Sequence, residues 1–276
     1  ITYAFEDLIS LGISFKKEKE NYLKLLAGGC SEKRVLTTGD MLGVQIVKKL
    51  MNEVNVKKRN FLEFTEVTNI EKFNNHFKII IKNLNTDETK EIESKIIVLC
   101  CGGTTYDYAL KNNSKTTNIP NINHKIRFVC KKLGLKMTEN IYQYQPFGLI
   151  YPKLRNRCLP EKISNFDIEI VNKFGEKVCS TKEDRLHIVN KINNCFKENK
   201  QIITEDGENC VELKFNKRLL NNFETHFPKF FKDFGNKVPE KIYITPILHY
   251  ELSGIKTDEN QSTSLKNIFC CGEMSY

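Results

Sequence analysis

The apolar run at residues 96–101 restricts the possible folds of this chain more than any other feature, because Gly102 and Gly103 follow it directly. A strand that is apolar on both faces is typical of the centre of a parallel sheet, covered by other layers. Gly-Gly at its carboxyl end lets backbone amides approach a ligand closely, at the edge where open α/β sheets bind nucleotides. A simple tight turn explains the two glycines equally well.

Hydrophobic spacing and turn residues predict an alternation of helices and strands along the rest of the chain. Helices are expected at residues 1–12, from Asp40 onward, at 122–134, at 185–197 and at 219–234, the last broken at Pro228. Strands are expected at residues 13–15, 60–70, 76–84, 89–95, 211–215, 242–250, 254–257 and 268–271, with an irregular, strand-like stretch at 135–180. This order indicates a nucleotide-binding domain interrupted by a second, inserted domain.

Charge and hydropathy exclude several classes of protein. The 43 Lys and Arg exceed the 34 Asp and Glu by 9, but the bases are scattered among acids, and the chain is rich in Asn, Lys and Ile, as AT-rich genomes produce. We therefore expect no nucleic-acid partner. The run at 96–101 is far shorter than the ~20 apolar residues that span a bilayer. With no secretory signal visible, the expected location is cytoplasmic.

The ten cysteines contain no Cys-x-x-Cys and no Cys/His cluster with zinc spacing, so no metal site is expected. Two adjacent pairs, Cys100-Cys101 and Cys270-Cys271, each close an apolar strand just before a glycine. Adjacent cysteines form a disulfide only with strain, and a free cysteine packs as a small apolar side chain. Buried free thiols are the expectation.

Several segments together resemble one family of FAD-dependent oxidoreductases. Residues 249–258 (HYELSGIKTD) followed by 263–273 (TSLKNIFCCGE) resemble a family segment H-Y-x-x-G-G-[IV]-x-[TV]-D that leads to an apolar strand ending in G-E. Further blocks follow the family order at residues 28–36 (GGCSEKRVL), 97–103 (IVLCCGG), 143–147 (QYQPF) and 185–189 (RLHIV). The family contains L-aspartate oxidase and the flavoprotein subunits of succinate dehydrogenase and fumarate reductase. The L-aspartate oxidase branch fits best, at residues 149–152 and 272–276.

The resemblance, which spans residues 3–276, implies bound FAD and hydride transfer from an amino dicarboxylate to flavin N5. In the L-aspartate oxidase branch the reaction converts L-aspartate to iminoaspartate for NAD biosynthesis, and a quinolinate synthase acts downstream. By match, Val67, Cys101, Gly102, Gly103 and Glu273 contact FAD. For Val67, packing in the core is an equally good explanation.

The same resemblance implies three catalytic residues: His249, Arg185 and Glu161. His249 matches the histidine that binds a substrate carboxylate, although a histidine in an apolar strand is usually a core residue. Arg185 matches the arginine that shuttles a proton, but this match needs a one-residue insertion, without which Leu186 takes the place. The alternative is a solvated arginine beside Asp184.

Departures from the family pattern lie in the implied substrate pocket. Gln145, matched to substrate binding, replaces a histidine, Phe147 replaces a threonine, Ala27 replaces a glutamate and Cys30 replaces a histidine. A G-D-G segment is replaced by polar residues near 123–124. Each hydrogen bond lost from a buried site costs roughly 1–3 kcal/mol. Two alternatives stay open: a flavoprotein of the succinate dehydrogenase or fumarate reductase type, and a relic of the family with impaired catalysis.

The expected fold class is therefore α/β: part of an FAD-binding Rossmann-like domain interrupted by an inserted α+β capping domain. The FAD-binding parts are expected at residues 1–137 and 250–276, and the capping domain at 138–249. The sequence contains no G-x-G-x-x-G, the loop that holds the pyrophosphate in such proteins. We expect that loop upstream of Ile1, and a second substrate-binding arginine downstream of Tyr276.

Overall fold

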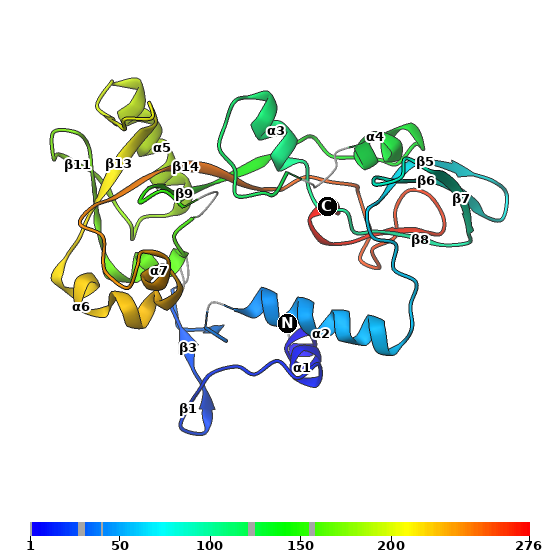
Figure 1. The fold of residues 1–276 in the computed structure, drawn as a ribbon, viewed down its shortest axis with the longest axis horizontal. Helices are drawn as coiled ribbons and strands as arrows, with labels where there is room; N and C mark the ends of the chain where they lie inside the picture. The colour runs from blue at the N-terminus through cyan, green and yellow to red at the C-terminus, as the bar shows by residue number, and fades with distance from the viewer. Residues whose placement is uncertain (1, 27–30, 40, 121–124, 155–157) are drawn as a thin grey trace. The chain divides into compact units, whose positions relative to one another are not determined.

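A computed structural model of the chain describes residues 2–26, 31–39, 41–120, 125–154 and 158–276 (Figure 1). The chain divides into two compact units, which are described separately. Unit 1 comprises Ile1–Phe61 and Leu159–Tyr243, and unit 2 comprises Leu62–Cys158 and Ile244–Tyr276. The division into an FAD-binding and a capping domain stays a prediction, because compactness alone does not identify a cofactor domain. Among the described residues, no helix combines the length and hydropathy that crossing a bilayer requires.

Unit 1 contains helices and short antiparallel strands. Its helices are α1 (Thr2–Ser10), α2 (Leu42–Val56), the 3₁₀ helix η1 (Glu161–Phe166), α5 (Arg185–Lys197), α6 (Lys217–His226) and α7 (Pro228–Asp233). Its strands are β1 (Lys17–Glu18), β2 (Asn21–Tyr22), β3 (Lys24–Leu25), β4 (Val35–Leu36), β10 (Glu169–Val171), β11 (Lys177–Ser180), β12 (Ile202–Ile203) and β13 (Asn209–Lys214). β10 lies between β11 and β13, β12 pairs with β13, and β1–β2 and β3–β4 pair separately.

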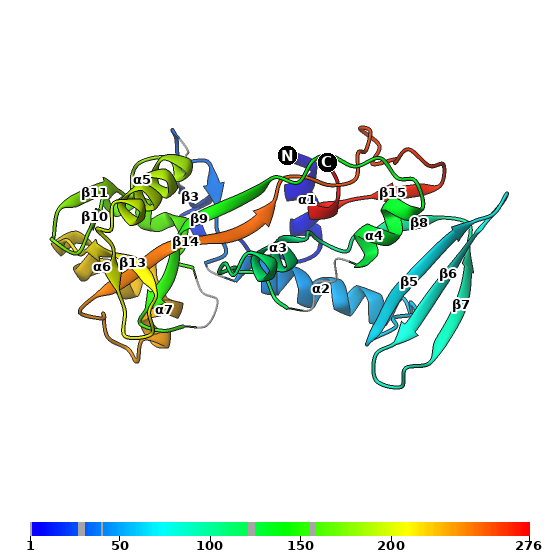
Figure 2. The same cartoon turned by 90° about the horizontal axis from the view of Figure 1, so that it is seen from above.

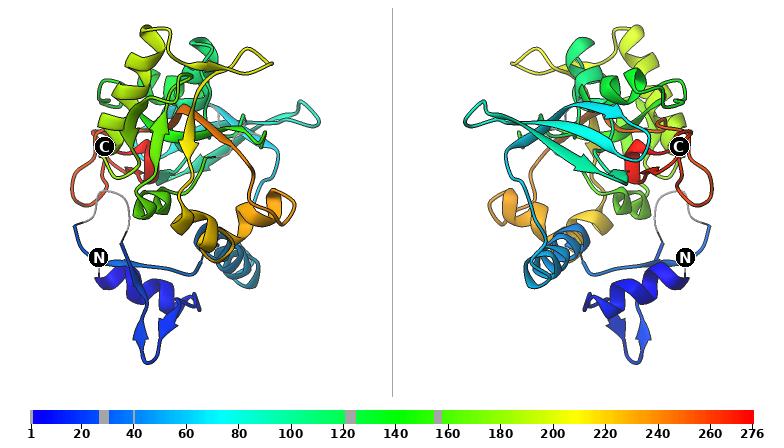
Figure 3. Two further views of the ribbon diagram at one scale, coloured as in Figure 1. Left: turned by 90° about the vertical axis from the view of Figure 1, so that its left-hand side faces the viewer. Right: turned by 90° about the vertical axis from the view of Figure 1, so that its right-hand side faces the viewer.

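Local sequence signals place the helices of unit 1. Asp184 caps α5 by accepting a hydrogen bond from the His187 backbone N–H at 2.9 Å, and Asn216 caps α6 in the same way. Pro228 begins α7, so the predicted break after α6 is confirmed (Figure 3). Helix α2 confirms the helix predicted from Asp40 onward, although Asp40 itself lies outside the described residues.

Unit 2 contains three groups of strands and two helices. Its elements are β5 (Thr65–Lys72), β6 (Phe77–Asn83), β7 (Thr89–Ser94), β8 (Ile97–Leu99), α3 (Thr105–Lys111), α4 (Lys125–Lys132), β9 (Tyr142–Tyr151), β14 (Ile242–Glu251, which begins in unit 1), β15 (Ile268–Cys270) and the 3₁₀ helix η2 (Gly272–Met274). β5, β6 and β7 correspond to the strands predicted at residues 60–70, 76–84 and 89–95, and they form an antiparallel sheet (Figure 2). β9 and β14 are neighbours in a second sheet, and β8 pairs with β15 in parallel.

One apolar core joins the β5–β6–β7 sheet, the β8–β15 pair and helix α4. It combines buried side chains from β5, β6, β8, α4, β15, η2 and the segments that connect them, namely Ile70, Phe77, Ile97, Leu99, Ile126, Val129, Cys130, Leu135, Ile255, Ile268, Cys270 and Met274. Burial of such side chains contributes roughly 1.5–3 kcal/mol each. The core therefore fixes the ends of β8 and β15 against helix α4.

The parallel pairing of β8 is confirmed, but the expected burial of both its faces is wrong. Ile97 and Leu99 are buried, whereas Val98 between them is 59% exposed. Side chains of a strand alternate between its two faces, and the described residues cover one face of β8. Cys100 and Cys101 are likewise exposed, so the expected burial of the thiols holds at Cys270 and fails at these two.

Two expected strands are absent and one helix was not predicted. Residues 13–15, between α1 and β1, form no strand. Residues 254–257 do not form a strand: Ile255 makes isolated bridges to Met137 and Ser275, because this segment crosses between other elements. Helix α3 was not predicted, because its seven residues are too few to show a helical spacing of apolar residues.

Gly254 gives a direct test of this packing. An alanine Cβ there would lie 2.4 Å from the Met274 carbonyl oxygen, which is backbone and cannot rotate away. We expect Gly254→Ala to destabilise the protein by about 1–3 kcal/mol. Gly43 in α2 has open space around its Cβ position, so Gly43→Ala should stabilise it by up to about 1 kcal/mol. Urea unfolding followed by circular dichroism measures both, and equal shifts of the two midpoints would contradict the packing.

Candidate functional site

The carboxyl ends of β8 and β15 form one edge of unit 2. Ile97, Val98 and Leu99 pair with Ile268, Phe269 and Cys270, and the Cys271 backbone N–H donates to the Leu99 carbonyl at 3.0 Å. Gly102 and Gly272, which follow the two strands, have φ values of +76° and +73°. Only glycine adopts this region without strain, so both strands end in turns where backbone approaches closely.

Glu273 turns its carboxylate toward Gly103. Its Oε1 accepts a hydrogen bond from the Glu251 backbone N–H at 2.8 Å, and a Cβ on Gly103 would lie 2.5 Å from the same oxygen. Any larger residue at position 103 would displace this carboxylate. The structure thus brings four of the predicted cofactor residues, Cys101, Gly102, Gly103 and Glu273, to one edge.

A buried ion pair lies directly beside this edge. Arg127 Nη2 lies 3.0 Å from Glu251 Oε2, and the two side chains are 10% and 0% exposed. The backbone N–H and hydroxyl of Thr104 donate to the same carboxylate oxygen at 2.6 and 2.9 Å, and the Ser253 hydroxyl donates to its Oε1 at 2.6 Å. The Tyr142 hydroxyl contacts Thr104 Oγ1 at 2.9 Å. Each of the two carboxylate oxygens of Glu251 thus accepts at least one hydrogen bond.

Sequence reasoning missed this network, although a signal was present. Glu251 ends a strand of mostly apolar residues, and Arg127 lies on the buried face of α4 beside Ile126, Val129 and Cys130. Opposite charges at two apolar positions indicate a buried pair, since either charge alone would be costly. Burial raises the pKa of Tyr142, so its hydroxyl remains protonated and able to donate at neutral pH.

A cavity of ≈730 Å³ opens next to the network in unit 2. Thr104, Arg127 and Tyr142 contribute to its lining. Arg127 Nε and Thr105 Oγ1 are buried without a hydrogen-bond partner among the described residues, although buried polar atoms in proteins are normally paired. Open space next to Gly272 also leaves room for a close backbone approach, so the edge fits a nucleotide cofactor.

His249 lies on β14 and is half-buried. Its Nδ1 is 2.8 Å from Thr117 Oγ1, and its carbonyl accepts from Asn118 Nδ2 at 2.6 Å. The ring is therefore oriented by a hydrogen bond and is not packed in the apolar core. Gln145 and Phe147 lie on β9, the strand next to β14, and are 4% and 2% exposed.

Arg185 and Glu161 form an ion pair in unit 1, between the first residue of α5 and the first residue of η1. Both side chains are partly buried, 25% and 33% exposed. Arg185 is therefore not the solvated arginine beside Asp184 of the alternative interpretation. Asp184 caps helix α5. Two of the predicted catalytic residues thus meet in unit 1, while His249 and Gln145 belong to unit 2.

The remaining predicted positions give a mixed outcome. Val67 pairs with Ile81 in the β5–β6 ladder and packs against the core of unit 2, as its packing alternative requires. Ala27 and Cys30, and the polar residues at 123–124, lie outside the described residues. Within the described ranges, His, Cys, Asp and Glu form no cluster that could hold a metal ion.

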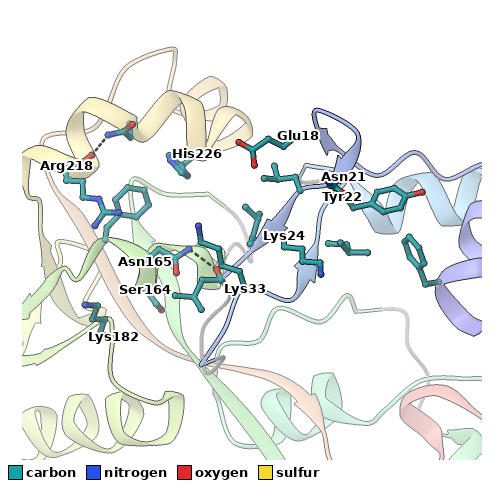
Figure 4. A pocket seen from close by; sticks show the side chains of 17 residues that line it. Glu18, Asn21, Tyr22, Lys24, Lys33, Ser164, Asn165, Lys182, Arg218 and His226 are labelled. Atoms are coloured by element: carbon teal, nitrogen blue, oxygen red, sulfur yellow. Dashed lines mark hydrogen bonds between the residues drawn. The ribbon is translucent and has the colours of Figure 1, made fainter. Parts of the chain in front are cut away.

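A larger cavity of ≈1480 Å³ opens in unit 1 and carries a positive lining (Figure 4). Lys24, Lys33, Lys182 and Arg218 contribute to this lining, against the carboxylate of Glu18. Burial, followed by the charges of Lys162 and Arg218, lowers the pKa of His226 at its rim. Such a concentration of one charge sign attracts anions from solution.

Parallel strands that end in glycine turns, beside polar atoms without a hydrogen-bond partner in the described residues, are typical of a protein that binds a nucleotide cofactor. The chain belongs to the family described as the FAD binding domain, whose model matches residues 3–276, and the cofactor of this family is FAD. The sequence-based assignment to FAD-dependent oxidoreductases related to L-aspartate oxidase is thereby confirmed at the level of the family.

The chain is similar to L-aspartate oxidases along nearly its whole length. It is 24% identical to the enzyme of Vibrio cholerae over 292 residues and 25% identical to that of Clostridium acetobutylicum over 281 residues. These alignments cover 98% of this chain, but 53% and 61% of the two relatives. The chain thus spans little more than half the length of these curated relatives.

The fold is that of a solved flavoprotein. A variant of the FrdA chain of E. coli quinol fumarate reductase superimposes with a TM-score of 0.83 at 18% identity, over 99% of this chain and 50% of the other. The predicted fold class, α/β of the FAD-binding type, is confirmed.

The buried ion pair gives a test of the site's construction. Removing one partner leaves the other charge buried and unpaired, so Arg127→Met and Glu251→Gln should each cost about 3–5 kcal/mol. The double variant should cost clearly less than the sum of the two, because no uncompensated charge remains. Urea unfolding of the four proteins measures this coupling.

The control is the exposed pair Lys82–Asp87 on the β6–β7 hairpin, at 2.6 Å. Replacing Lys82 by Met should shift the unfolding midpoint little, because solvent screens exposed charges. Strict additivity at Arg127 and Glu251 would mean that the two charges do not stabilise each other.

Proposed function

We propose that this chain is the part of an FAD-dependent oxidoreductase that binds the flavin and the substrate, and that the substrate is an amino dicarboxylate. In the proposed reaction L-aspartate becomes iminoaspartate: the carbon–hydrogen bond breaks as a hydride leaves for flavin N5, and the nitrogen loses one proton. The observation that carries the proposal is the edge formed by β8 and β15, where Gly102, Gly103 and Glu273 converge. The L-aspartate oxidases with matching sequences support this choice of substrate.

Cofactor binding is assigned to the residues of that edge. The backbone at Gly102 and Gly103 would lie along the FAD, and the carboxylate of Glu273, held by the Glu251 N–H, would accept from hydroxyls of the cofactor. Bound FAD supplies the hydride acceptor, which no amino-acid side chain provides. The protein in turn orients the substrate, binds its carboxylates and removes a proton.

His249 is assigned to a substrate carboxylate. When the Thr117 hydroxyl donates to Nδ1, the ring carries its proton on Nε2, which can donate to a carboxylate oxygen. Thr117 would thus select the tautomer that the proposed role needs.

Arg185 and Glu161 are assigned to the proton. The guanidinium keeps its charge at any physiological pH, so it can bind a carboxylate or stabilise charge that develops on the substrate. Glu161, paired with it, would accept the proton that leaves the substrate nitrogen. The partial exposure of both side chains gives that proton a route to solvent.

The position of Phe147 favours the second candidate, a member of the family with impaired turnover. Phe147 is 2% exposed and replaces the hydroxyl-bearing residue of the family pattern, so it offers an apolar wall where a donor is expected. Gln145, also buried, keeps an amide where the family has an imidazole. Succinate, which lacks the amino group, is the substrate of the third candidate, a protein of the succinate dehydrogenase or fumarate reductase type.

The wider assignments rest on the resemblance. A cytoplasmic location, a role in NAD biosynthesis and a quinolinate synthase downstream are those of the L-aspartate oxidase branch. The FAD-binding domain is proposed at residues 1–137 and 250–276, with the capping domain at 138–249.

Flavin spectroscopy of the full-length protein tests the proposed function. The purified protein should show flavin absorbance, and L-aspartate added without oxygen should bleach it, because reduced flavin loses its visible bands. Succinate in a parallel cuvette distinguishes the third candidate. Flavin that neither compound bleaches would support the impaired relative, and a protein without flavin would overturn the proposal.

Replacing His249 tests its assigned role. A hydrogen bond to a charged group contributes about 1.5–3 kcal/mol, so His249→Ala should lower the second-order rate constant of flavin bleaching by about 10- to 150-fold. The flavin content should stay unchanged. His76, which stacks on Phe73 in the same unit at a ring distance of 5.0 Å, provides the control: His76→Ala should leave the rate unaltered. Equal rates for both variants would remove His249 from the site.

A further inference from the structure

Cys100 and Cys271 face each other across the end of the β8–β15 pair. Their sulfur atoms lie 3.1 Å apart, the closest approach the structure records between two thiols among the described residues. The two cysteines continue the parallel register directly, one position beyond the pair Leu99 and Cys270. Their proximity thus follows from the strand pairing and does not depend on a loop.

The register also suits a covalent bond. Neighbouring strands lie about 4.8 Å apart, inside the range of about 4.4–6.8 Å between Cα atoms that disulfides occupy. A disulfide bond is about 2.05 Å long, so rotation of the two side chains by a small amount closes the gap. Cys100 and Cys101, being adjacent in the chain, would form a strained ring instead.

Access separates this pair from the other cysteines. Cys100 is exposed and Cys271 is partly exposed, whereas Cys130, Cys179 and Cys270 are buried. A small reagent therefore has better access to this pair than to the three buried cysteines. Cys101 is exposed too, and this makes it the natural control.

We propose that Cys100 and Cys271 form a reversible disulfide by exchange with a small-molecule disulfide such as glutathione disulfide. One of the two thiolates attacks the reagent, forms a mixed disulfide and releases one thiolate of glutathione. The second protein thiolate then attacks the mixed disulfide and releases the other. The two cysteines lose two protons and two electrons, and glutathione disulfide takes up the electrons as two thiols.

The environment of Cys100 sets the conditions under which the bond forms. Desolvation of its sulfur, followed by the contact with Cys271, raises the pKa of Cys100 to about 11. The thiolate is the reacting form. Below the pKa its fraction, and with it the rate of exchange at Cys100, rises about tenfold for each unit by which the pH increases. Attack by Cys100 should thus be slow at pH 7 and much faster at pH 9.

The bond would join the two chain segments that carry Gly102 and Gly272. It would fix the register of β8 against β15, whose three paired residues otherwise hold together by hydrogen bonds and packing. This inference does not depend on the proposed oxidation of aspartate, since it concerns thiols of the protein alone.

Peptide mapping tests the proposal. The full-length protein is equilibrated at pH 8.5 with reduced and oxidised glutathione, its remaining thiols are blocked with N-ethylmaleimide, and it is digested with trypsin without reduction. The tryptic peptide at residues 96–111 should be found linked to the peptide that begins at Asn267. Dithiothreitol should release both peptides. Fragment spectra that separate Cys100 from Cys101, and Cys270 from Cys271, assign the bond in the unaltered protein.

Variants provide the matched controls. Cys100→Ser and Cys271→Ser should each abolish the linked peptide, and Cys101→Ser should keep it. The proposal is overturned if the link survives in Cys100→Ser, if it is lost in Cys101→Ser, or if N-ethylmaleimide labels both cysteines fully at every glutathione ratio. Flavin content and bleaching are recorded separately, so a failure here leaves the proposed function unaffected, and the reverse also holds.

Discussion

The parallel pairing of β8 with β15 is the constraint on which the rest of the site depends. The pairing joins residues that are 171 positions apart in sequence, such as Ile97 and Ile268. It places two glycine turns, at Gly102 and Gly272, at the same edge. Without this register Glu273 could not turn toward Gly103, and Cys100 could not meet Cys271. One short strand pair thus positions both the proposed cofactor contacts and the thiol pair.

The ion pair between Arg127 and Glu251 lies beside that edge and is connected to it by hydrogen bonds. Buried ion pairs seldom add net stability, because desolvation offsets the attraction, but removing one partner is costly. Here Thr104 and Ser253 supply the remaining hydrogen bonds of the carboxylate. The backbone of Glu251 in turn holds the carboxylate of Glu273. Glu251 therefore connects helix α4, the turn after Gly103 and the 3₁₀ helix η2 that follows β15.

The sequence predicted those features that depend on local signals. Helix α5 begins and ends at the predicted residues, because a capping Asp184 and a clear apolar period mark it. The parallel pairing of β8 was predictable from its apolar run and its glycines. The exposure of Val98 was not, because it depends on which elements cover a face. The ion pair between Arg127 and Glu251 was not predicted for a similar reason. Each residue has the sequence context of an ordinary surface charge, and the two are 124 positions apart in the chain.

The burial of Phe147 and Gln145 distinguishes the effects of these two departures from the family pattern. Phe147 is fully packed, so an apolar ring stands where the family pattern has a hydroxyl. Gln145 is equally buried but retains an amide, which both donates and accepts hydrogen bonds. Together with His249, oriented by Thr117, this leaves an amide and an imidazole on two neighbouring strands. In the proposed site these two groups would take the place of the two imidazoles and the hydroxyl of the family pattern.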